Sequence, residues 1–222
     1  RSYIAGVFVE MTVEGTVFAT LKTFGVVLVM AIVMHWIWLC VLFVGTGLAQ
    51  GRSPVMLIKN MLPAYFTALG TMSSAATIPV ALQASKRNGV SDGIANFTVP
   101  LCATIHLCGS TITLVTCATA VMFLSEHLAI PGYGTMVPFI MMLGVIMIAA
   151  PGAPGGGVMS ALGLLTSMLG FGEASIALMI ALYLAQDSFG TACNVTGDGV
   201  IALWADRFAR GEPALSTEQD AA

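Results

Sequence analysis

Residues 149–157 have the sequence AAPGAPGGG and lie in the middle of a long apolar segment, residues 137–169. Proline and glycine are the poorest helix-forming residues, so the two prolines and four glycines of this stretch interrupt any continuous helix. The apolar flanks on both sides are not typical of an ordinary solvated loop. The pattern predicts two apolar helical arms that meet at a flexible tip.

A second apolar segment, residues 61–83, is interrupted in the same way at TMSSAATIP, residues 71–79. Ser73 and Ser74 lie where one half-helix ends and the next begins. The unpaired N–H groups and the positive dipole end at such a point favour an anion. Serine is also common in membrane helices as a simple interhelical contact, so a structural role stays open.

The composition is that of a chain surrounded by lipid, with 57% hydrophobic and 9% charged residues and a mean hydropathy of +0.92. A net charge of -3 does not favour a nucleic-acid partner, which needs clustered Lys and Arg. Five cysteines lie in apolar segments without CxxC spacing, so we expect neither a disulfide framework nor a zinc site. The chain starts at Arg1 without a signal-peptide pattern, and we expect a fragment of a longer protein.

Helical segments of about 20 apolar residues can cross a bilayer. The expected order is the end of a preceding scaffold helix at 1–20, a transmembrane helix at 21–50, a first re-entrant hairpin at 57–86, a transmembrane helix with a broken centre at 92–125, a second re-entrant hairpin at 136–170, a last transmembrane helix at 175–209 and a cytoplasmic polar tail at 210–222.

The basic residues support this order, because cytoplasmic loops collect Lys and Arg. Six of the eight form three pairs, namely Arg52 with Lys59, Lys86 with Arg87, and Arg207 with Arg210. If all three pairs are cytoplasmic, the first hairpin enters and leaves on one side and the second enters from the other. This arrangement is an inverted repeat, in which paired interrupted segments indicate a transporter's binding site.

Four polar residues of the last span, Asp187, Thr191, Asn194 and Asp198, are spaced at intervals of four, three and four. They therefore share one helix face. Each intramembrane carboxylate costs roughly 2.5 to 3.5 kcal/mol on insertion scales, so both should face the protein interior. A site for a cation and an amine is the favoured interpretation, since oxygen ligands suit a hard cation. A purely structural pair is the alternative.

The chain resembles the dicarboxylate/amino acid:cation symporters, the glutamate and neutral amino acid transporter family, over about residues 6–210. Four motifs carry the resemblance: SSAATIP from Ser73, FTVPLCATIHLCGS from Phe97, APGAPGGG from Ala150 and QDSFGTACNVTGDG from Gln186. It implies an all-α membrane protein, with two re-entrant hairpins in an inverted repeat. It also implies an elevator mechanism, and a homotrimer formed through scaffold helices that this chain lacks.

The resemblance also implies roles for individual residues. The substrate would contact Ser73, Ser74, Asp187, Thr191, Asn194, Gly190, Ala153 and Gly155, with Asp187 on its amino group and the serines on its carboxylate. One sodium site would use Asp198, Asn194 and backbone near Cys102, and a second would use backbone near Thr104, Ile148 and Ala150. The second hairpin would be the gate, with Pro151, Gly152, Pro154, Gly156 and Gly157 at its tip.

The first departure from the family pattern concerns the substrate. Members that carry acidic substrates place an arginine three residues after the aspartate, where this chain has Gly190, and Met72 offers no replacement. A second substrate carboxylate would then be buried without a cation, which is strongly disfavoured. We expect a neutral amino acid such as serine, threonine or alanine, as in the bacterial serine/threonine branch, and a bacterial inner membrane. A glutamate or aspartate substrate is the alternative.

The second departure concerns the coupling ion. The family's Asn-Met-Asp signature is replaced by His106, Leu107 and Cys108, which removes a carboxylate used for sodium. Sodium at the Asp198 site is the expected coupling ion, and a role for His106 in binding it is doubtful. Proton coupling through His106 is the alternative.

Other classes of function compete less well. Ser73 or Ser74 with His106 and Asp187 could supply the residue types of an intramembrane serine hydrolase, but no G-x-S-x-G motif is present. We therefore expect no enzyme activity. A passive channel could also use broken hairpins. A purely structural subunit would leave the buried carboxylates and both interrupted segments unexplained.

Overall fold

The computed structural model describes residues 17–125 and 127–211, and all regular structure in these ranges is helical. The all-helical prediction is confirmed for this part of the chain. The helices are α2 (Val17–Gln50), α3 (Pro54–Thr71), α4 (Ser74–Arg87), α5 (Asp92–Ile105), α6 (Cys108–Leu124), α7 (Tyr133–Met147), α8 (Gly156–Leu169), α9 (Glu173–Leu184) and α10 (Asp187–Gly211). Residues 1–16 of the expected scaffold-helix end and residues 212–222 of the expected tail lie outside the described ranges.

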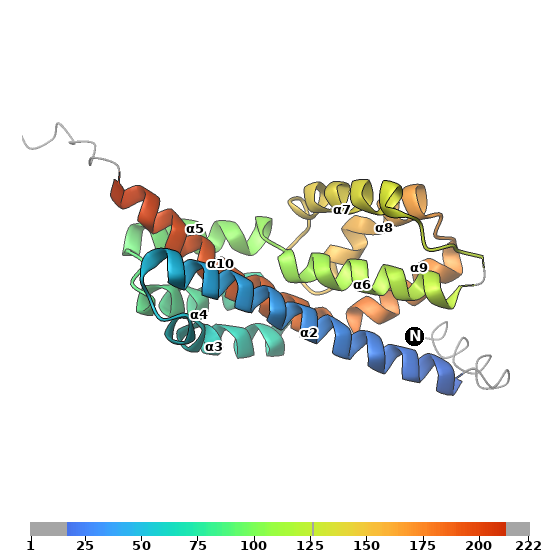
Figure 1. The fold of residues 1–222 in the computed structure, drawn as a ribbon, viewed down its shortest axis with the longest axis horizontal. Helices are drawn as coiled ribbons and strands as arrows, with labels where there is room; N and C mark the ends of the chain where they lie inside the picture. Colours follow the sequence, from blue (N-terminus) through green and yellow to red (C-terminus); the bar gives the residue numbers. More distant parts are fainter. Residues whose placement is uncertain (1–16, 126, 212–222) are drawn as a thin grey trace, which may run out of the picture.

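The molecule is elongated, with different helices gathered at its two ends. Helices α3, α4 and α5 pack at one end and α6, α7, α8 and α9 at the other, while α2 and α10 extend along the molecule (Figure 1). The end of α2, the α4–α5 connection and the end of α10 lie together at the first end. This end carries all three of the basic pairs that the sequence analysis singled out.

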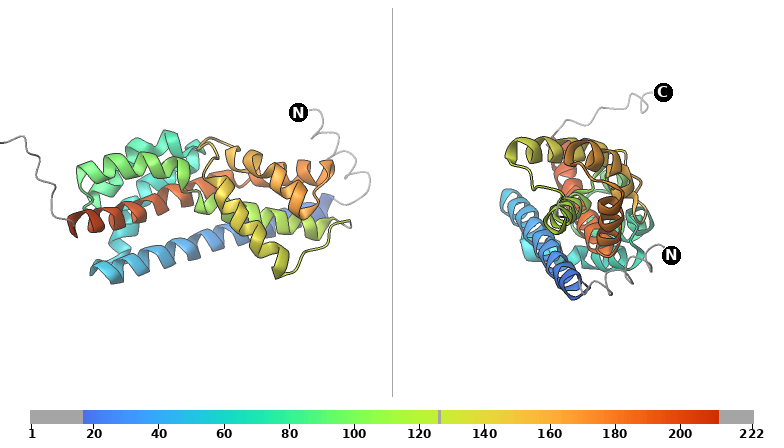
Figure 2. Two further views of the ribbon diagram at one scale, coloured as in Figure 1. Left: turned by 90° about the horizontal axis from the view of Figure 1, so that it is seen from above. Right: turned by 90° about the vertical axis from the view of Figure 1, so that its right-hand side faces the viewer.

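Two helical hairpins come from these opposite ends. Helices α3 and α4 fold back at Met72 and Ser73, and helices α7 and α8 fold back over residues 148–155. The two tips face each other near the middle of the molecule (Figures 1 and 2). The placement of these hairpins relative to a bilayer, and with it the re-entrant and elevator assignments, stays a prediction.

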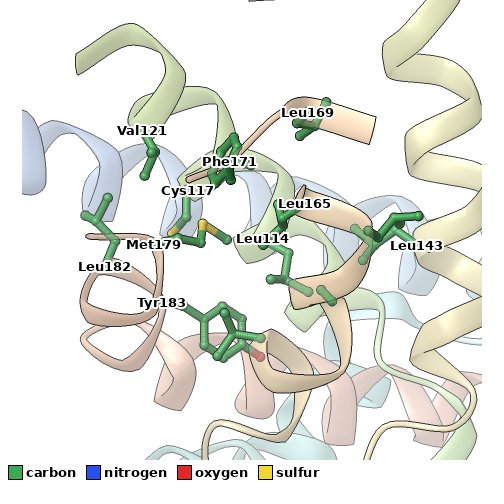
Figure 3. Packing of buried hydrophobic residues seen from close by; sticks show 14 of the residues in the cluster. Leu114, Cys117, Val121, Leu143, Leu165, Leu169, Phe171, Met179, Leu182 and Tyr183 are labelled. Atoms are coloured by element: carbon green, nitrogen blue, oxygen red, sulfur yellow. The ribbon is translucent and has the colours of Figure 1, made fainter. Parts of the chain in front are cut away.

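Two clusters of buried apolar side chains hold the ends together. One joins α2, α3, α4, α5 and α10 around residues such as Leu57, Met61 and Tyr65. The other joins α6, α7, α8 and α9, where side chains such as Leu114 and Met179 converge (Figure 3). Helix α10 supplies six of the buried polar residues in the described part of the chain, including Asp187, Asn194 and Asp198.

The last predicted span is bent where we expected one continuous helix at 175–209. Helices α9 and α10 form an angle of 58° at a short break, and Ala185 and Gln186 lie between them. The backbone tightens there, because the Gln186 N–H donates to the Tyr183 carbonyl at 2.9 Å and the Gln186 carbonyl accepts from Phe189 at 3.0 Å. The Gln186 side chain donates back to the Leu182 carbonyl at 3.3 Å. The break places Asp187 at the start of α10.

Candidate functional site

The first hairpin tip is a tight turn stabilised by its own side chains. Met72 adopts a left-handed conformation, with φ of 54°, and is the one non-glycine residue with positive φ in the described ranges. Ser73 is the N-cap of α4, and its hydroxyl accepts from the Ala76 N–H at 3.3 Å. Strained backbone of this kind tends to occur at binding and switch regions. Ser74, the first residue of α4, is buried and lines the cavity between the tips.

The second tip lies directly on the first tip and on α10. The Ser73 hydroxyl donates to the Gly152 carbonyl at 3.0 Å. The Gly155 N–H donates to Oδ2 of Asp187 at 2.7 Å. Gly155 has φ of 75°, a conformation that favours glycine, and it precedes the first turn of α8. The backbone of the second tip therefore bonds both to a residue expected to bind the substrate carboxylate and to one expected to bind its amino group.

The glycines of the second tip permit close approach at two points. A Cβ atom on Gly152 would lie 2.6 Å from the Ala103 carbonyl, at the end of α5. A Cβ on Gly157 would lie 2.5 Å from the Tyr183 hydroxyl. The tip of this hairpin lies against α5, and its arm α8 lies against α9, at distances that larger side chains would not allow.

Between the tips lies a small cavity. The cavity has a volume of about 10 Å³, which is room for roughly one water molecule. Its walls include Ser74 from α4, Gly152 and Ala153 from the second tip, and Asp187, Thr191 and Asn194 from α10. The cavity is too small to hold an amino acid in this structure.

The lining residues on α10 and α6 form a polar wall. Asp187, Thr191 and Asn194 are all buried. The Asn194 amide oxygen accepts from the N–H groups of Gly109 at 2.7 Å and Ser110 at 3.2 Å, and its Nδ2 donates to the Ser110 hydroxyl at 2.9 Å. Because Leu107, the N-cap residue of α6, provides no side-chain cap, Asn194 satisfies this helix terminus from α10. Its predicted contacts with substrate and sodium stay predictions.

Gly190 does not line the cavity. A Cβ at this position would lie 3.0 Å from the Thr113 hydroxyl oxygen and 3.4 Å from the Gly109 carbonyl. The α-carbon of Gly190 therefore faces α6 at close range. No Lys, Arg or His side chain occurs among the residues that line this cavity in the described part of the chain.

The buried Asp198 and the partly exposed His106 form a pair next to the break between α5 and α6. Nδ1 of His106 lies 2.8 Å from Oδ1 of Asp198, and the Asp198 side chain is 2% exposed. The His106 N–H donates to the Cys102 carbonyl at 2.9 Å. Gly197 leaves room for the ring, because a Cβ there would lie 2.9 Å from Cε1 of His106. His106 therefore contacts two of the groups expected to hold sodium.

The donor chemistry of this region suits a hard cation only in part. Asp198 and the Cys102 carbonyl are oxygen ligands of the kind that such a cation prefers. The imidazole occupies one carboxylate oxygen of Asp198. Sodium would have to share that carboxylate with His106 or displace the ring.

The second expected ion site is less well defined by side chains. Ile148 and Ala150 belong to the turn after α7, where the Ala150 N–H donates to the Met147 carbonyl at 3.2 Å. The Thr104 hydroxyl donates to the Leu101 carbonyl at 2.8 Å. The approach of Gly152 to Ala103 brings this turn beside the end of α5. The described residues contain no group of three or more His, Cys, Asp or Glu that could hold a metal ion.

Four cavity residues were not among the predicted site residues: Met72, Leu107, Ser110 and Tyr183. Tyr183 precedes Asp187 by four residues and extends the series at 187, 191, 194 and 198 by one turn. That spacing is a usable signal. Leu107 and Ser110 come to the cavity only through the break between α5 and α6, so local spacing gives no indication of them.

The model of the sodium:dicarboxylate symporter family matches residues 2–208. The chain belongs to this family. The family prediction from the four motifs is confirmed, and the family consists of symporters rather than enzymes.

Named relatives of this symporter family member are transporters from animals. The chain is 30% identical to excitatory amino acid transporter 1 of Mus musculus over 211 residues, which are 94% of this chain and 38% of the relative. It is 27% identical to neutral amino acid transporter B(0) of Oryctolagus cuniculus over 220 residues, which are 96% of this chain and 40% of the relative. The chain thus spans about two fifths of these relatives.

The apolar helices are those of a multi-pass membrane protein of this family. Two segments, Phe24–Gln50 and Asp92–Leu124, are long and apolar enough to cross a membrane. The bent pair α9 and α10 brings the number to three if it forms one span. These counts refer to residues 17–125 and 127–211.

Proposed function

We propose that the protein containing this chain is a secondary active transporter that couples uptake of a small neutral amino acid, such as serine, threonine or alanine, to a cation gradient. The main support is the charge of the cavity, whose lining has one carboxylate, Asp187, and no basic side chain among the described residues. A zwitterion places one ammonium group against that carboxylate. The side-chain carboxylate of glutamate or aspartate would have no partner there.

The substrate carboxylate would bind at the first tip. The N-terminus of α4 supplies unpaired N–H groups and a positive dipole end, and the Ser73 hydroxyl is a further donor. Thr191, also in the wall of the cavity, would contact the substrate side chain. In this structure the Ser73 hydroxyl bonds to Gly152 and Asp187 bonds to Gly155. Substrate binding would replace both of these bonds.

The second hairpin would act as the gate. Its tip has to leave Ser73 and Asp187 to admit an amino acid, since the cavity holds roughly one water molecule. Pro151, Gly152, Pro154, Gly156 and Gly157 allow this segment to change conformation without long stretches of helix having to unfold. An elevator movement of the whole domain in a homotrimer, and a bacterial inner membrane, are part of the same proposal and rest on the sequence resemblance.

Sodium is the proposed coupling ion, and its binding would depend on Asp198 with the Cys102 carbonyl. Bound sodium would supply a positive charge that offsets the buried carboxylate. Proton coupling is the second candidate. It is favoured by the contact of 2.8 Å between His106 and Asp198, which gives the carboxylate a partner within the protein itself.

The test uses the full-length parent protein in proteoliposomes. We expect a sodium gradient to drive uptake of labelled serine, with little uptake of aspartate, and we expect Asp198→Ala to abolish the dependence on sodium. Preference for aspartate over serine would overturn the assignment of a neutral substrate. Uptake driven by a proton gradient and indifferent to sodium would support the second candidate, and equilibration without any gradient dependence would indicate a channel.

The role of His106 is tested by His106→Asn, which restores the amide found at this position in the family pattern. If sodium is the coupling ion, this variant should require less sodium for half-maximal uptake, because the imidazole no longer occupies Asp198. If protons are coupled through His106, uptake driven by a proton gradient should be lost.

A further inference from the structure

A larger cavity, of about 370 Å³, lies away from the candidate site, at the end of the molecule where α2, α4 and α10 finish. Its walls come from the α2–α3 connection, the α4–α5 connection and the last turns of α10. We name it the arginine pocket after three of its lining residues, Arg52, Arg207 and Arg210. The ends of these helices lie at the same end of the molecule in Figure 1 and in the left-hand view of Figure 2.

The lining of the arginine pocket has an excess of positive charge. Three guanidinium groups face one carboxylate, that of Asp206. Asp206 already accepts from the Ser91 N–H at 2.9 Å and from Nε of Arg210 at 2.8 Å. Among the described residues, Arg52 and Arg207 have no carboxylate within ion-pair distance. Two positive charges of the pocket are therefore not neutralised by this part of the chain.

Backbone groups hold two of the three arginines in position. Arg207 donates to the Ala49 carbonyl and its guanidinium lies 5.5 Å from the centre of the Trp204 ring. Arg210 donates to the Gly89 carbonyl at 3.1 Å. These bonds use only some of the five N–H donors that each guanidinium carries.

Arg52 also lies against Gly89, the residue whose carbonyl accepts from Arg210. A Cβ on Gly89 would lie 3.2 Å from Nη2 of Arg52, and Gly89 has φ of 79°, so the position favours glycine on both counts. The guanidinium groups of Arg52, in the α2–α3 connection, and Arg210, in α10, thus meet the same residue. Like charges gathered in this way repel one another, and an anion bound between them would reduce that repulsion.

We propose that the arginine pocket binds a phosphate group. Guanidinium groups recognise phosphate oxygens through paired N–H donors, and they do so best when they are already held in place. The pocket lies at the end that carries the three basic pairs, which the positive-inside rule assigns to the cytoplasmic surface. Anionic phospholipid headgroups lie at the cytoplasmic membrane surface, and basic pockets between helices at that surface bind them. Soluble phosphate offers the same chemistry.

The first experiment measures lipid binding to the full-length parent protein by native mass spectrometry. Phosphatidylglycerol is titrated against phosphatidylcholine for the wild type, for Arg52→Gln and for Arg87→Gln. Arg87 is exposed, belongs to the same basic end and does not line the pocket. We expect phosphatidylglycerol binding to weaken about tenfold in Arg52→Gln, as loss of hydrogen bonds to a charged group does, and to be unchanged in Arg87→Gln.

The second experiment distinguishes the source of the phosphate. Thermal unfolding of the same three proteins is followed in potassium phosphate and in potassium chloride at equal ionic strength. Stabilisation by phosphate that is lost in Arg52→Gln, without a preference for phosphatidylglycerol, would assign the pocket to a soluble phosphate. An equal loss in both variants would indicate diffuse surface charge and overturn the proposal, and so would the absence of binding by either probe. Serine uptake, measured in parallel, shows whether Arg52→Gln is correctly folded.

Discussion

The two hairpin tips have the same overall design but are held very differently. The first consists of two residues, Met72 and Ser73, between α3 and α4, whereas the second extends over eight, 148–155. The first tip is stabilised by its own side chains, including the Ser73 cap and a bond of 3.2 Å between the Thr71 and Thr77 hydroxyls. The second has no side-chain cap at the start of α8. Its recorded polar contacts with the first tip and α10 are Ser73 with Gly152 and Asp187 with Gly155.

The first arms of the two hairpins, α3 and α7, differ in the same direction, whereas the second arms do not, because α4 buries five residues and α8 seven. Helix α3 buries five residues along its length: Leu57, Met61, Ala64, Tyr65 and Ala68. Helix α7 buries three, Phe139, Leu143 and Met147, and its other apolar side chains, such as Met141 and Val145, are exposed. Elements with few buried contacts open at lower free energy than the core. The proposal of a fixed first hairpin and a second hairpin that detaches therefore rests on the tips and on α7, and the three predictions below test it.

The largest effect is expected from Asp187→Asn in the full-length parent protein. The amide keeps an oxygen for the Gly155 N–H, so the second tip can still dock, but the charge that would bind the substrate amino group is lost. Serine affinity, measured by calorimetry at saturating sodium, should fall about 100-fold, as expected when one partner of a buried charge pair is neutralised. Glu173→Gln, at the exposed start of α9, is the control and should bind normally. Unchanged affinity in Asp187→Asn would place the amino group elsewhere.

A smaller effect, on stability, is expected from Gly157→Ala in the second hairpin. The added methyl group would lie 2.5 Å from the Tyr183 hydroxyl, and overpacking of this kind costs about 1 to 3 kcal/mol. Gly163→Ala in the same helix is the matched control, because no heavy atom lies within 4 Å of its Cβ. It should stabilise the helix by roughly 0.5 to 1 kcal/mol.

Thermal unfolding of the full-length protein measures both changes. Tyr183→Phe in the Gly157→Ala background should restore part of the loss, because it removes the clashing oxygen. Equal effects of the two alanines would mean that α8 is not packed closely against Tyr183, and that the second hairpin is already detached.

The smallest effect is expected from replacing the two serines that cap α3 and α4. Ser73 caps α4 and Ser53 caps α3, each by accepting a backbone N–H, but only Ser73 also donates to the second tip. Each serine-to-alanine change should cost about 1 kcal/mol of stability. Only Ser73→Ala should speed hydrogen–deuterium exchange at residues 149–157, by a few-fold. If Ser53→Ala has the same effect on that segment, the bond between Ser73 and Gly152 does not hold the tip closed.

Local features of the sequence predicted the helical class and the family. The helices break at Ser73 and within residues 149–157, as predicted. These breaks are local, because a serine cap starts a helix at its own position and proline and glycine disfavour helix at theirs. The bend at Ala185 and Gln186 was missed, since no proline or glycine marks it. It is stabilised instead by Gln186, whose side chain also contacts Cys117 on α6 at 3.4 Å.

The sequence by itself therefore determined which segments are apolar helices, where most of them break, and which symporter family they belong to. Only the tertiary structure decided that Asn194 caps α6, that His106 lies against Asp198, and that the second tip bonds to Asp187. Only it gathered Arg52, Arg207 and Arg210 around one cavity. Helix breaking depends on neighbours within a few residues, whereas each of these contacts joins residues 32 to 158 positions apart. Such contacts depend on how the whole chain packs, which no local pattern specifies.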